Sequence, residues 1–291
     1  MDRFAILKIL LEELNLKFIV IRIDGNRHFF IYPEEVIFEP VIAMLGYPPE
    51  AVLRKMANCK TVLVAHYDRV KDSPGANDNS VAVFELVKAA LTLKRGNIGS
   101  WLVIFTDKEE LSCGASLKEQ GSYSLAKFLK EGILDKTHIF IFDCCGVGDT
   151  LIISTAVDHL LQNEDSTGFA RSRHLVAQMR ERSLVAARNI RLERVLLVPT
   201  PFSDDAGFFR AGLAAQTITV LPASEASELA SLLRLRPELA DALVSEQDGV
   251  EKDFIPKTWL SINGPGDRYE TLTPRNFQKI TDFALALVGV S

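Results

Sequence analysis

The amino-acid sequence predicts an α/β protein in which helices cover both faces of a mixed, mostly parallel central sheet. Two observations support this class. Short runs rich in β-branched residues alternate with helical patterns along the chain, which is typical of α/β folds. The 291 residues also suffice for a large buried core, since 47% are hydrophobic and 24% are charged, as in an ordinary globular protein. We therefore expect a single domain over residues 1–291.

Eight short runs have the composition of strands. The first two flank Asp24-Gly25, a dipeptide typical of a tight hairpin turn. The others are apolar except for a Thr or Ser at one or two positions in some of them, as expected of strands that are buried on both faces. The predicted strands cover residues 18–23, 28–31, 61–65, 101–106, 139–142, 151–154, 195–198 and 217–221.

Helical patterns fill the intervals between these runs. The apolar residues of segment 1–18 are interrupted by Lys8, Glu12 and Glu13, and no small-residue cleavage site follows. This pattern indicates an amphipathic helix rather than a signal peptide, and so we expect a cytoplasmic protein. Further helices are predicted at residues 81–91, 169–188 and 274–288.

Two segments stand apart from the regular alternation. Residues 1–57 combine the first helix with the hairpin, and we expect this extension at one edge of the sheet. Residues 224–248 are rich in Leu, Ala and Glu, and Pro237 divides them into two short helices. This helical insertion either packs on the rim of the domain or serves as a lid or a subunit contact.

The composition excludes several classes of partner. With 33 basic and 38 acidic residues the net charge is −5, and binding to nucleic acid requires a basic face. No apolar run reaches the roughly 18 residues that span a bilayer. The four cysteines form no C-x-x-C pair, so they predict neither a disulfide framework nor a zinc knuckle. We therefore expect neither nucleic acid nor membrane as a partner, and homo-oligomerisation is left open.

Side chains that bind metals follow three successive predicted strands. The first strand is followed by His66 and Asp68, the second by Glu109 and Glu110, and the third by Asp143. Because the carboxyl ends of parallel strands meet at one edge of a sheet, we expect these side chains to lie close together. Imidazole and carboxylate groups are ligands of divalent metals. The sequence therefore predicts a metal site at this edge.

The loop before the helix at residue 81 supplies a further carboxylate. It reads Gly75-Ala76-Asn77-Asp78-Asn79-Ser80. Asp78 or Asn79 either caps the helix or has a role in the site. In the second interpretation, Asp78 offers its carboxylate from a backbone made pliable by Gly75. One carboxylate can bridge two cations about 3.5–4 Å apart.

These elements, taken in order, resemble a known family. His66-Tyr67-Asp68, the Gly75–Ser80 loop, Glu109-Glu110 and Asp143 are similar to the motifs of the co-catalytic zinc aminopeptidases, peptidase family M28, which also contains glutaminyl cyclases. The resemblance covers residues 61–288 and implies a zinc exopeptidase-like, three-layer α/β/α fold. Segments 203–205 and 264–267 also resemble elements of the family.

The resemblance implies a metal-binding role for most of these residues. His66 would bind the first ion, Asp68 would fix the tautomer of His66, and Asp78 would bridge both ions. Glu110 would complete the first site, and Asp143 would bind the second ion. The implied cofactor is zinc, as one or two ions, or another divalent metal.

The resemblance also implies the reaction. Glu109 would be the general base, which takes a proton from the attacking water and later passes it to the leaving amine. The implied activity is that of an aminopeptidase acting on small peptides. Phe202, Phe208, Phe209 and Trp259 either line an apolar pocket for the substrate side chain or belong to the core.

One departure from the family pattern concerns the last metal ligand. The family has a His where this chain has Asn263. An amide oxygen is a poorer zinc ligand than imidazole and suits harder cations. Three outcomes are open: Asn263 ligates through its oxygen, His159 or His174 takes its place in space, or the second metal is lost.

A second departure lies in segment 203–205, where Asp205 stands in place of a His that is common in the family. The neighbouring Asp204 would either support the site from outside the ligand shell or cap the helix predicted at residues 206–211. The two departures favour an alternative function, a catalytically degenerate relative that acts as a binding or scaffold protein. A hydrolase or aminoacyltransferase of the glutaminyl cyclase kind is a third hypothesis.

Overall fold

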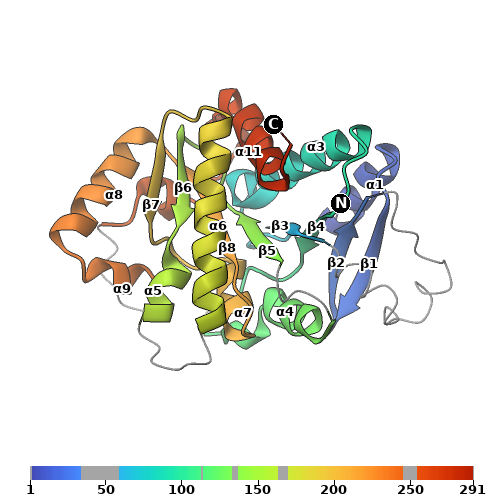
Figure 1. The fold of residues 1–291 in the computed structure, drawn as a ribbon, viewed down its shortest axis with the longest axis horizontal. Helices are drawn as coiled ribbons and strands as arrows, with labels where there is room; N and C mark the ends of the chain where they lie inside the picture. Colours follow the sequence, from blue (N-terminus) through green and yellow to red (C-terminus); the bar gives the residue numbers. More distant parts are fainter. Residues whose placement is uncertain are drawn as a thin grey trace.

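The computed structural model describes residues 2–33, 59–112, 114–132, 137–162, 170–244 and 254–290. In this part of the chain, a sheet of eight strands runs through the centre of the molecule and helices cover both faces (Figure 1). The predicted α/β class with a mixed sheet is confirmed. The strands are β1 (Phe18–Ile23), β2 (Asn26–Ile31), β3 (Thr61–His66), β4 (Trp101–Thr106), β5 (His138–Phe142), β6 (Thr150–Ser154), β7 (Val195–Val198) and β8 (Gln216–Leu221).

The strands lie in the order β1-β2-β4-β3-β5-β8-β6-β7. At the centre, β4, β3, β5 and β8 are parallel to one another. The hairpin of β1 and β2 joins one edge antiparallel to β4, as the Asp24-Gly25 turn predicts. At the other edge, β6 runs antiparallel to β8, and β7 is parallel to β6. The parallel centre places three strand ends, those of β4, β3 and β5, side by side.

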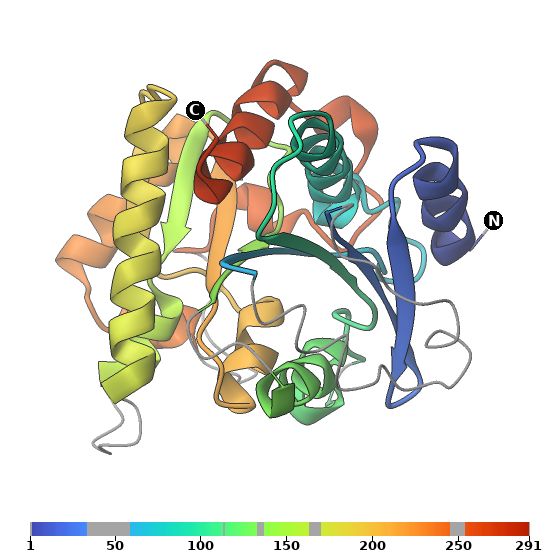
Figure 2. The same ribbon diagram turned by 45° about the vertical axis from the view of Figure 1, so that its right-hand side comes forward.

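Helices form a layer on each face of the sheet (Figure 2). One face is covered by α1 (Arg3–Glu13), α3 (Val81–Arg95), α6 (Ala170–Asn189) and α11 (Phe277–Val288). The other face is covered by α4 (Gly121–Gly132) and α7 (Asp204–Arg210). The remaining α-helices are α5 (Ala156–Gln162), α8 (Ala223–Leu235), α9 (Leu239–Leu243) and α10 (Lys257–Leu260).

The alternation of side chains along β3 shows why both faces are apolar. Val62 and Val64 pack with α4 and α7, whereas Leu63 and Ala65 pack with α3 and α11. Successive residues of a strand point to opposite faces, so that a strand between two helical layers needs an unbroken apolar run. This is the pattern that residues 61–65 display.

The segment at residues 224–248 packs on the sheet in its described part. Pro237 lies between α8 and α9, as predicted. Leu229 of α8 and Leu243 of α9 belong to the apolar cluster of Ile152 and Val198, which lie on β6 and β7. These contacts agree with the interpretation of an insertion packed on the domain. Residues 245–248 and residues 34–57 of the N-terminal extension lie outside the described part.

Some helices carry no clear sequence signal. Helix α4 begins with Gly121-Ser122, which favours a turn over a helix, and neither α4 nor α5 was predicted. The predicted helix at 274–288 begins as a 3-10 turn over Pro274–Asn276, and Phe169 of the helix at 169–188 lies outside the described residues. None of the described helices combines the length and apolar character that crossing a bilayer requires.

The core between the sheet and α11 can be tested with two phenylalanines. Phe283 of α11 is fully buried against Phe142, with ring centroids 6.3 Å apart, whereas Phe84 of α3 is 56% exposed. We expect Phe283→Ala to lower the free energy of unfolding by about 3–5 kcal/mol, because it removes a buried ring and leaves a cavity. The matched control, Phe84→Ala, should change it by about 0.5 kcal/mol or less. Urea denaturation measures both, and equal losses would contradict this placement of the core.

Candidate metal centre

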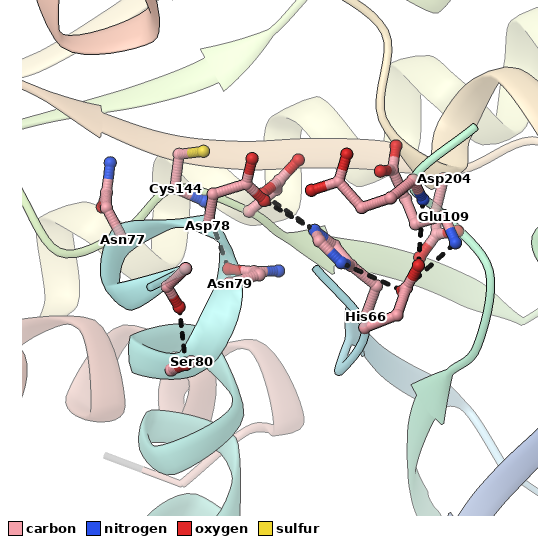
Figure 3. Close-up of polar contacts among 12 residues, drawn as sticks. His66, Asn77, Asp78, Asn79, Ser80, Glu109, Cys144 and Asp204 are labelled. Atoms are coloured by element: carbon pink, nitrogen blue, oxygen red, sulfur yellow. Dashed lines mark hydrogen bonds and ion pairs between the residues drawn. The ribbon is translucent and has the colours of Figure 1, made fainter. Parts of the chain in front are cut away.

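The predicted metal-binding side chains lie together at the carboxyl ends of the central strands (Figure 3). His66 is the last residue of β3, and Asp143 directly follows β5. Glu109 and Glu110 follow β4, on the other side of β3. Because these strands pair in parallel, their ends carry residues from distant parts of the sequence to one place.

His66 is the residue shared by the clusters of ligand atoms. Its Nε2 atom lies 3.0 Å from Oδ1 of Asp78 and 3.6 Å from Oδ1 of Asp143. The ligand atoms of His66, Asp78 and Asp143 all lie within 4.8 Å of one another, and so do those of His66, Glu109 and Glu110. One imidazole among several carboxylates is a donor set that zinc accepts.

Asp68 contacts the imidazole of His66 on the side opposite Asp78, and it also contacts the loop after β4. Its Oδ1 atom lies 3.3 Å from Nδ1 of His66, the ring nitrogen that faces away from Asp78. The same carboxylate accepts hydrogen bonds from the backbone N–H groups of Glu109 at 3.2 Å and Glu110 at 3.0 Å. Burial acts to raise the pKa of Asp68, but its bonds to His66 and to the backbone hold that pKa below the usual value. Asp68 therefore stays charged and orients both the imidazole and the loop after β4.

The backbone that carries Asp78 is fixed on two sides. Asp267 accepts hydrogen bonds from the backbone N–H groups of Asn77 at 2.7 Å and Asp78 at 3.0 Å. On the other side, Asn77 Oδ1 accepts from the N–H of Gly146, and the amide of Asn79 donates to the carbonyl of Phe142. These bonds tie the segment η2 (Ala76–Ser80) to the chain beyond β5.

Gly75 permits the entry into this segment, because its φ of 62° lies in the left-handed region that glycine favours. A side-chain carbon at this position would also lie 2.6 Å from the guanidinium of Arg3. The N-cap of α3 is Ser80, and its side chain makes no capping bond, so neither Asp78 nor Asn79 is the residue that caps this helix.

The charges of the cluster are unbalanced. Burial acts to lower the pKa of His66, but the carboxylates of Asp143, Asp68 and Asp78 outweigh it and raise that pKa well above the usual value. Burial raises the pKa of Glu109 well above its usual value and that of Glu110 to about 8. Neighbouring carboxylates add to the effect of burial on the pKa of Glu109 and Glu110, because they crowd together with little positive charge among them. A divalent cation would supply that charge, and so the residues fit a metal ion.

Glu109 differs from the other carboxylates in its hydrogen-bond partner. Its Oε1 atom accepts a hydrogen bond of 3.1 Å from the amide of Gln120, and Gln120 Oε1 in turn accepts from the hydroxyl of Ser122. Asp204 lies beside Glu109 (Figure 3), and its Oδ2 atom accepts a hydrogen bond of 2.6 Å from the hydroxyl of Thr106. Gln120 thus fixes the Oε1 atom of Glu109, and this bond does not involve the Oε2 atom.

Asp204 and Asp205 make different contacts. The carboxylate of Asp204 bonds to Thr106 at the end of β4, whereas Asp205 Oδ1 accepts from the backbone N–H of Ser203 at the start of α7. Both side chains are fully buried, and burial raises the pKa of each to about 6. Because α7 begins at Asp204, two residues earlier than predicted, Asp204 is not its cap, and the carboxylate of Asp204 instead bonds to the end of β4.

Asn263 lies against Glu110 and Asp78. With its amide nitrogen turned toward them, it donates to Oε1 and Oε2 of Glu110 at 2.8 and 3.3 Å and to Oδ2 of Asp78 at 3.2 Å. The contacts place His66 with Asp78 and Asp143, and Glu110 with Asp78 and Asn263. Because the ligand atoms of Glu110 also lie within 4.8 Å of those of His66, the expected assignment of Glu110 to the site of His66 stays a prediction.

Neither histidine considered as a substitute for Asn263 lies in the cluster. His159 of α5 has its Nε2 atom 2.5 Å from Oδ1 of Asp241 on α9, and His174 is exposed on α6. His159 was one of the open alternatives because it follows β6, but β6 runs antiparallel to β8, so that its carboxyl end points away from those of β3 and β5.

A pocket of about 230 Å³ opens beside Asp143. Of the four aromatic residues considered for it, Phe202 and Trp259 line the pocket. Phe208 is fully buried and Phe209 packs against the core, so those two do not. The walls are mostly apolar, with Ile255 and the hydroxyls of Thr200, Ser203, Thr217 and Thr219 among them.

Arg3 is a residue of the site that the sequence did not reveal. Its guanidinium donates hydrogen bonds to the carbonyls of Tyr67, Asp68, Pro74 and Gly75 and to the hydroxyl of Ser80, at 2.8–3.2 Å. Arg3 thereby holds both ends of the loop between His66 and Asp78. The contact carries no sequence signal, because it joins α1 to a loop more than 60 residues away.

Known proteins resemble this chain in sequence pattern and in fold. The sequence pattern of peptidase family M28 matches residues 50–288. No curated protein sequence gives a significant match.

Solved structures of low sequence identity share the fold. A zinc aminopeptidase from Bacillus subtilis superimposes with a TM-score of 0.54 at 20% identity, over 90% of this chain and 49% of that one. A glutaminyl cyclase from Porphyromonas gingivalis gives 0.59 at 12% identity, over 98% and 87%. The LapA aminopeptidase of Legionella pneumophila gives 0.56 at 12% identity, over 98% and 61%. The chain thus spans about half the length of the Bacillus enzyme.

The contacts of Arg3 predict an effect on metal binding. We expect Arg3→Ala to weaken zinc binding about 10-fold, because outer partners of metal ligands typically contribute 10–100-fold to affinity. Arg3→Lys should restore part of the affinity, since an ammonium keeps the charge but cannot reach as many acceptors. Competition with a chelating dye measures the affinity, with the exposed Arg22→Ala as the matched control. Unchanged affinity in Arg3→Ala would refute the positioning role.

Proposed function

The chain belongs to peptidase family M28, and from this membership and the arrangement of its carboxylates we propose that it is a zinc-dependent aminopeptidase acting on small peptides. The observation that carries the proposal is the difference in hydrogen-bond partners between Glu109 and Glu110. Glu109 follows the same strand as Glu110 and is held by Gln120, whereas Glu110 faces Asp78 and Asn263. Two adjacent carboxylates therefore have different surroundings, which allows Glu109 alone to act as the base.

Residues of this chain would hold the metal and orient the reaction. His66, Asp78 and Asp143 are the ligands that the geometry favours, and Asp68 keeps the imidazole of His66 aligned. The chemistry that zinc supplies in such a site is polarisation of the scissile carbonyl.

Glu109 would take the proton from the attacking water and deliver it to the leaving amine. Burial raises the pKa of Glu109, which brings a carboxylate closer to the range where it both accepts and returns a proton near neutral pH. Gln120 fixes one oxygen of Glu109 through its amide, so that the other oxygen is available for proton transfer. Asp204, beside it, adds negative charge that favours the protonated state.

The substrate class follows from the surroundings of the cluster. The excess of carboxylates attracts a cationic group, such as the α-ammonium of a peptide. The pocket beside Asp143, with Phe202, Ile255 and Trp259 in its walls, accommodates an apolar side chain. A peptide with a free amino terminus and an apolar first residue meets both conditions.

One observation favours a second candidate function. Asn263 replaces an imidazole next to Glu110, and a centre that lost its metal would be catalytically inactive. The protein would then be a binding or scaffold member of the family. Hydrolysis of an aminoacyl-arylamide separates the two functions, because only the peptidase releases the arylamine. A glutaminyl cyclase would instead convert a glutaminyl-arylamide to the cyclised product.

The role of Glu109 predicts the effect of removing one charge. We expect Glu109→Gln to lower kcat for leucine p-nitroanilide by about 10²–10⁴-fold, the usual contribution of a general base. The amide of the introduced Gln cannot accept the proton, which explains the lower kcat. The zinc content of the variant should stay unchanged, because the metal ligands remain. The matched control is Glu228→Gln on the exposed surface of α8, which should leave kcat as it is.

Two results would count against this assignment. An unchanged kcat in Glu109→Gln would exclude Glu109 as the base. A zinc-loaded wild-type protein that cleaves no aminoacyl-arylamide or peptide would contradict the peptidase itself and support the binding function.

A further inference from the structure

The region around Asp78 contains two unequal sets of ligands. The first set consists of His66, Asp78 and Asp143, one imidazole and two carboxylates, which is the three-ligand arrangement of zinc sites that keep a position open. The second set consists of Asp78, Glu110 and Asn263, in which every available ligand atom is an oxygen and one of them belongs to a neutral amide. Such a set holds zinc poorly.

Asn263 differs from an imidazole that binds a metal, because its amide nitrogen can donate hydrogen bonds to the neighbouring carboxylates. With Nδ2 facing inward, its two protons point to three oxygen atoms, two of Glu110 at 2.8 and 3.3 Å and one of Asp78 at 3.2 Å. The opposite orientation would set the amide oxygen against the same three acceptors with no proton between them. Hydrogen bonding therefore favours the orientation in which the amide nitrogen faces the carboxylates.

The backbone supports this placement of the side chain. Asn263 has a φ of 65°, in the left-handed region, and Asn is among the few residues other than glycine that adopt it readily. The residue is followed by Gly264-Pro265-Gly266, and Asp267 of the same loop binds the backbone of Asp78. The loop that carries Asn263 is thus hydrogen-bonded to the backbone of Asp78, the residue whose carboxylate Asn263 contacts.

The two oxygens of Asp78 face different partners. Oδ1 lies 3.0 Å from Nε2 of His66, within the first set, whereas Oδ2 is the acceptor for Asn263. A carboxylate that bridges two ions would give one oxygen to each. Here one oxygen faces the imidazole of His66 and the other faces the amide of Asn263.

We propose that the centre holds a single zinc ion, bound by His66, Asp78 and Asp143, and that the Asn263 amide takes the place of a second ion by donating hydrogen bonds to Glu110 and Asp78. This inference rests on the proposed metal-dependent function and specifies its metal content. Glu110 is then a hydrogen-bonded partner of Asn263 rather than a metal ligand.

Metal content tests the inference without an assay of activity. The metal-free protein is titrated with zinc by calorimetry, and the zinc retained after dialysis is counted by mass spectrometry. We expect about one zinc per wild-type chain and about two per Asn263→His chain, because imidazole completes a second zinc site with Asp78 and Glu110. Asn263→Ala is the matched control that removes the amide without adding a ligand, and it should retain about one.

Two further variants locate the single ion. Asp143→Ala should lose the bound zinc, whereas Glu110→Gln should keep it, because only Asp143 belongs to the first set. A cadmium-loaded sample gives an independent count by ¹¹³Cd NMR, in which the wild-type protein should show one resonance. Circular dichroism of each variant confirms that it is folded before its metal content is compared.

The outcomes separate this inference from the function on which it rests. Two zinc or manganese ions bound with similar affinity by the wild-type protein would overturn the single-ion centre and leave the metallopeptidase intact. One ion in a folded Asn263→His chain would show that Asn263 is not what limits the second site. A wild-type protein that binds no divalent metal would overturn both the inference and the metal-dependent function.

Discussion

The carboxylate of Asp68 is the group on which the centre depends. It contacts the imidazole of His66 and accepts the backbone N–H groups of Glu109 and Glu110, so that one buried charge links the end of β3 to the loop after β4. Removing it would leave the imidazole without an orienting partner and two backbone donors unpaired. The strands bring these residues near one another, and Asp68 sets their relative orientation.

The rest of the chain holds the site from outside the ligands. Arg3, which precedes the region matched by the family, donates hydrogen bonds to both ends of the loop between His66 and Asp78. Asp267, near the other end of the chain, binds the backbone at Asp78. The N-terminal helix and the C-terminal loop therefore converge on one short segment. A site with so many like charges needs such support, because its carboxylates repel one another when no cation lies among them.

The predicted strands and most long helices could be obtained from sequence because their signals are local. Residues 101–105 are all apolar, as expected of a strand between two helical layers, and β4 has the predicted bounds of 101–106. The position of His159 could not be obtained in this way. It follows a strand, as His66 does, but the direction of that strand depends on its pairing with β8, which no local pattern encodes. The helix α4, which starts at Gly121-Ser122, was missed because tertiary packing outweighed weak local propensity.

The sequence by itself determined the α/β class, the order of the elements and the set of residues that follow the central strands, because alternating composition and strand ends are properties of short segments. The tertiary structure alone decided how those residues are divided. It placed Asp143 beside His66, turned Asn263 toward Glu110 and Asp78, and brought Arg3 to the loop. These contacts join positions far apart in the chain, and their distances depend on how the loops leave the sheet. Composition and spacing do not carry that information.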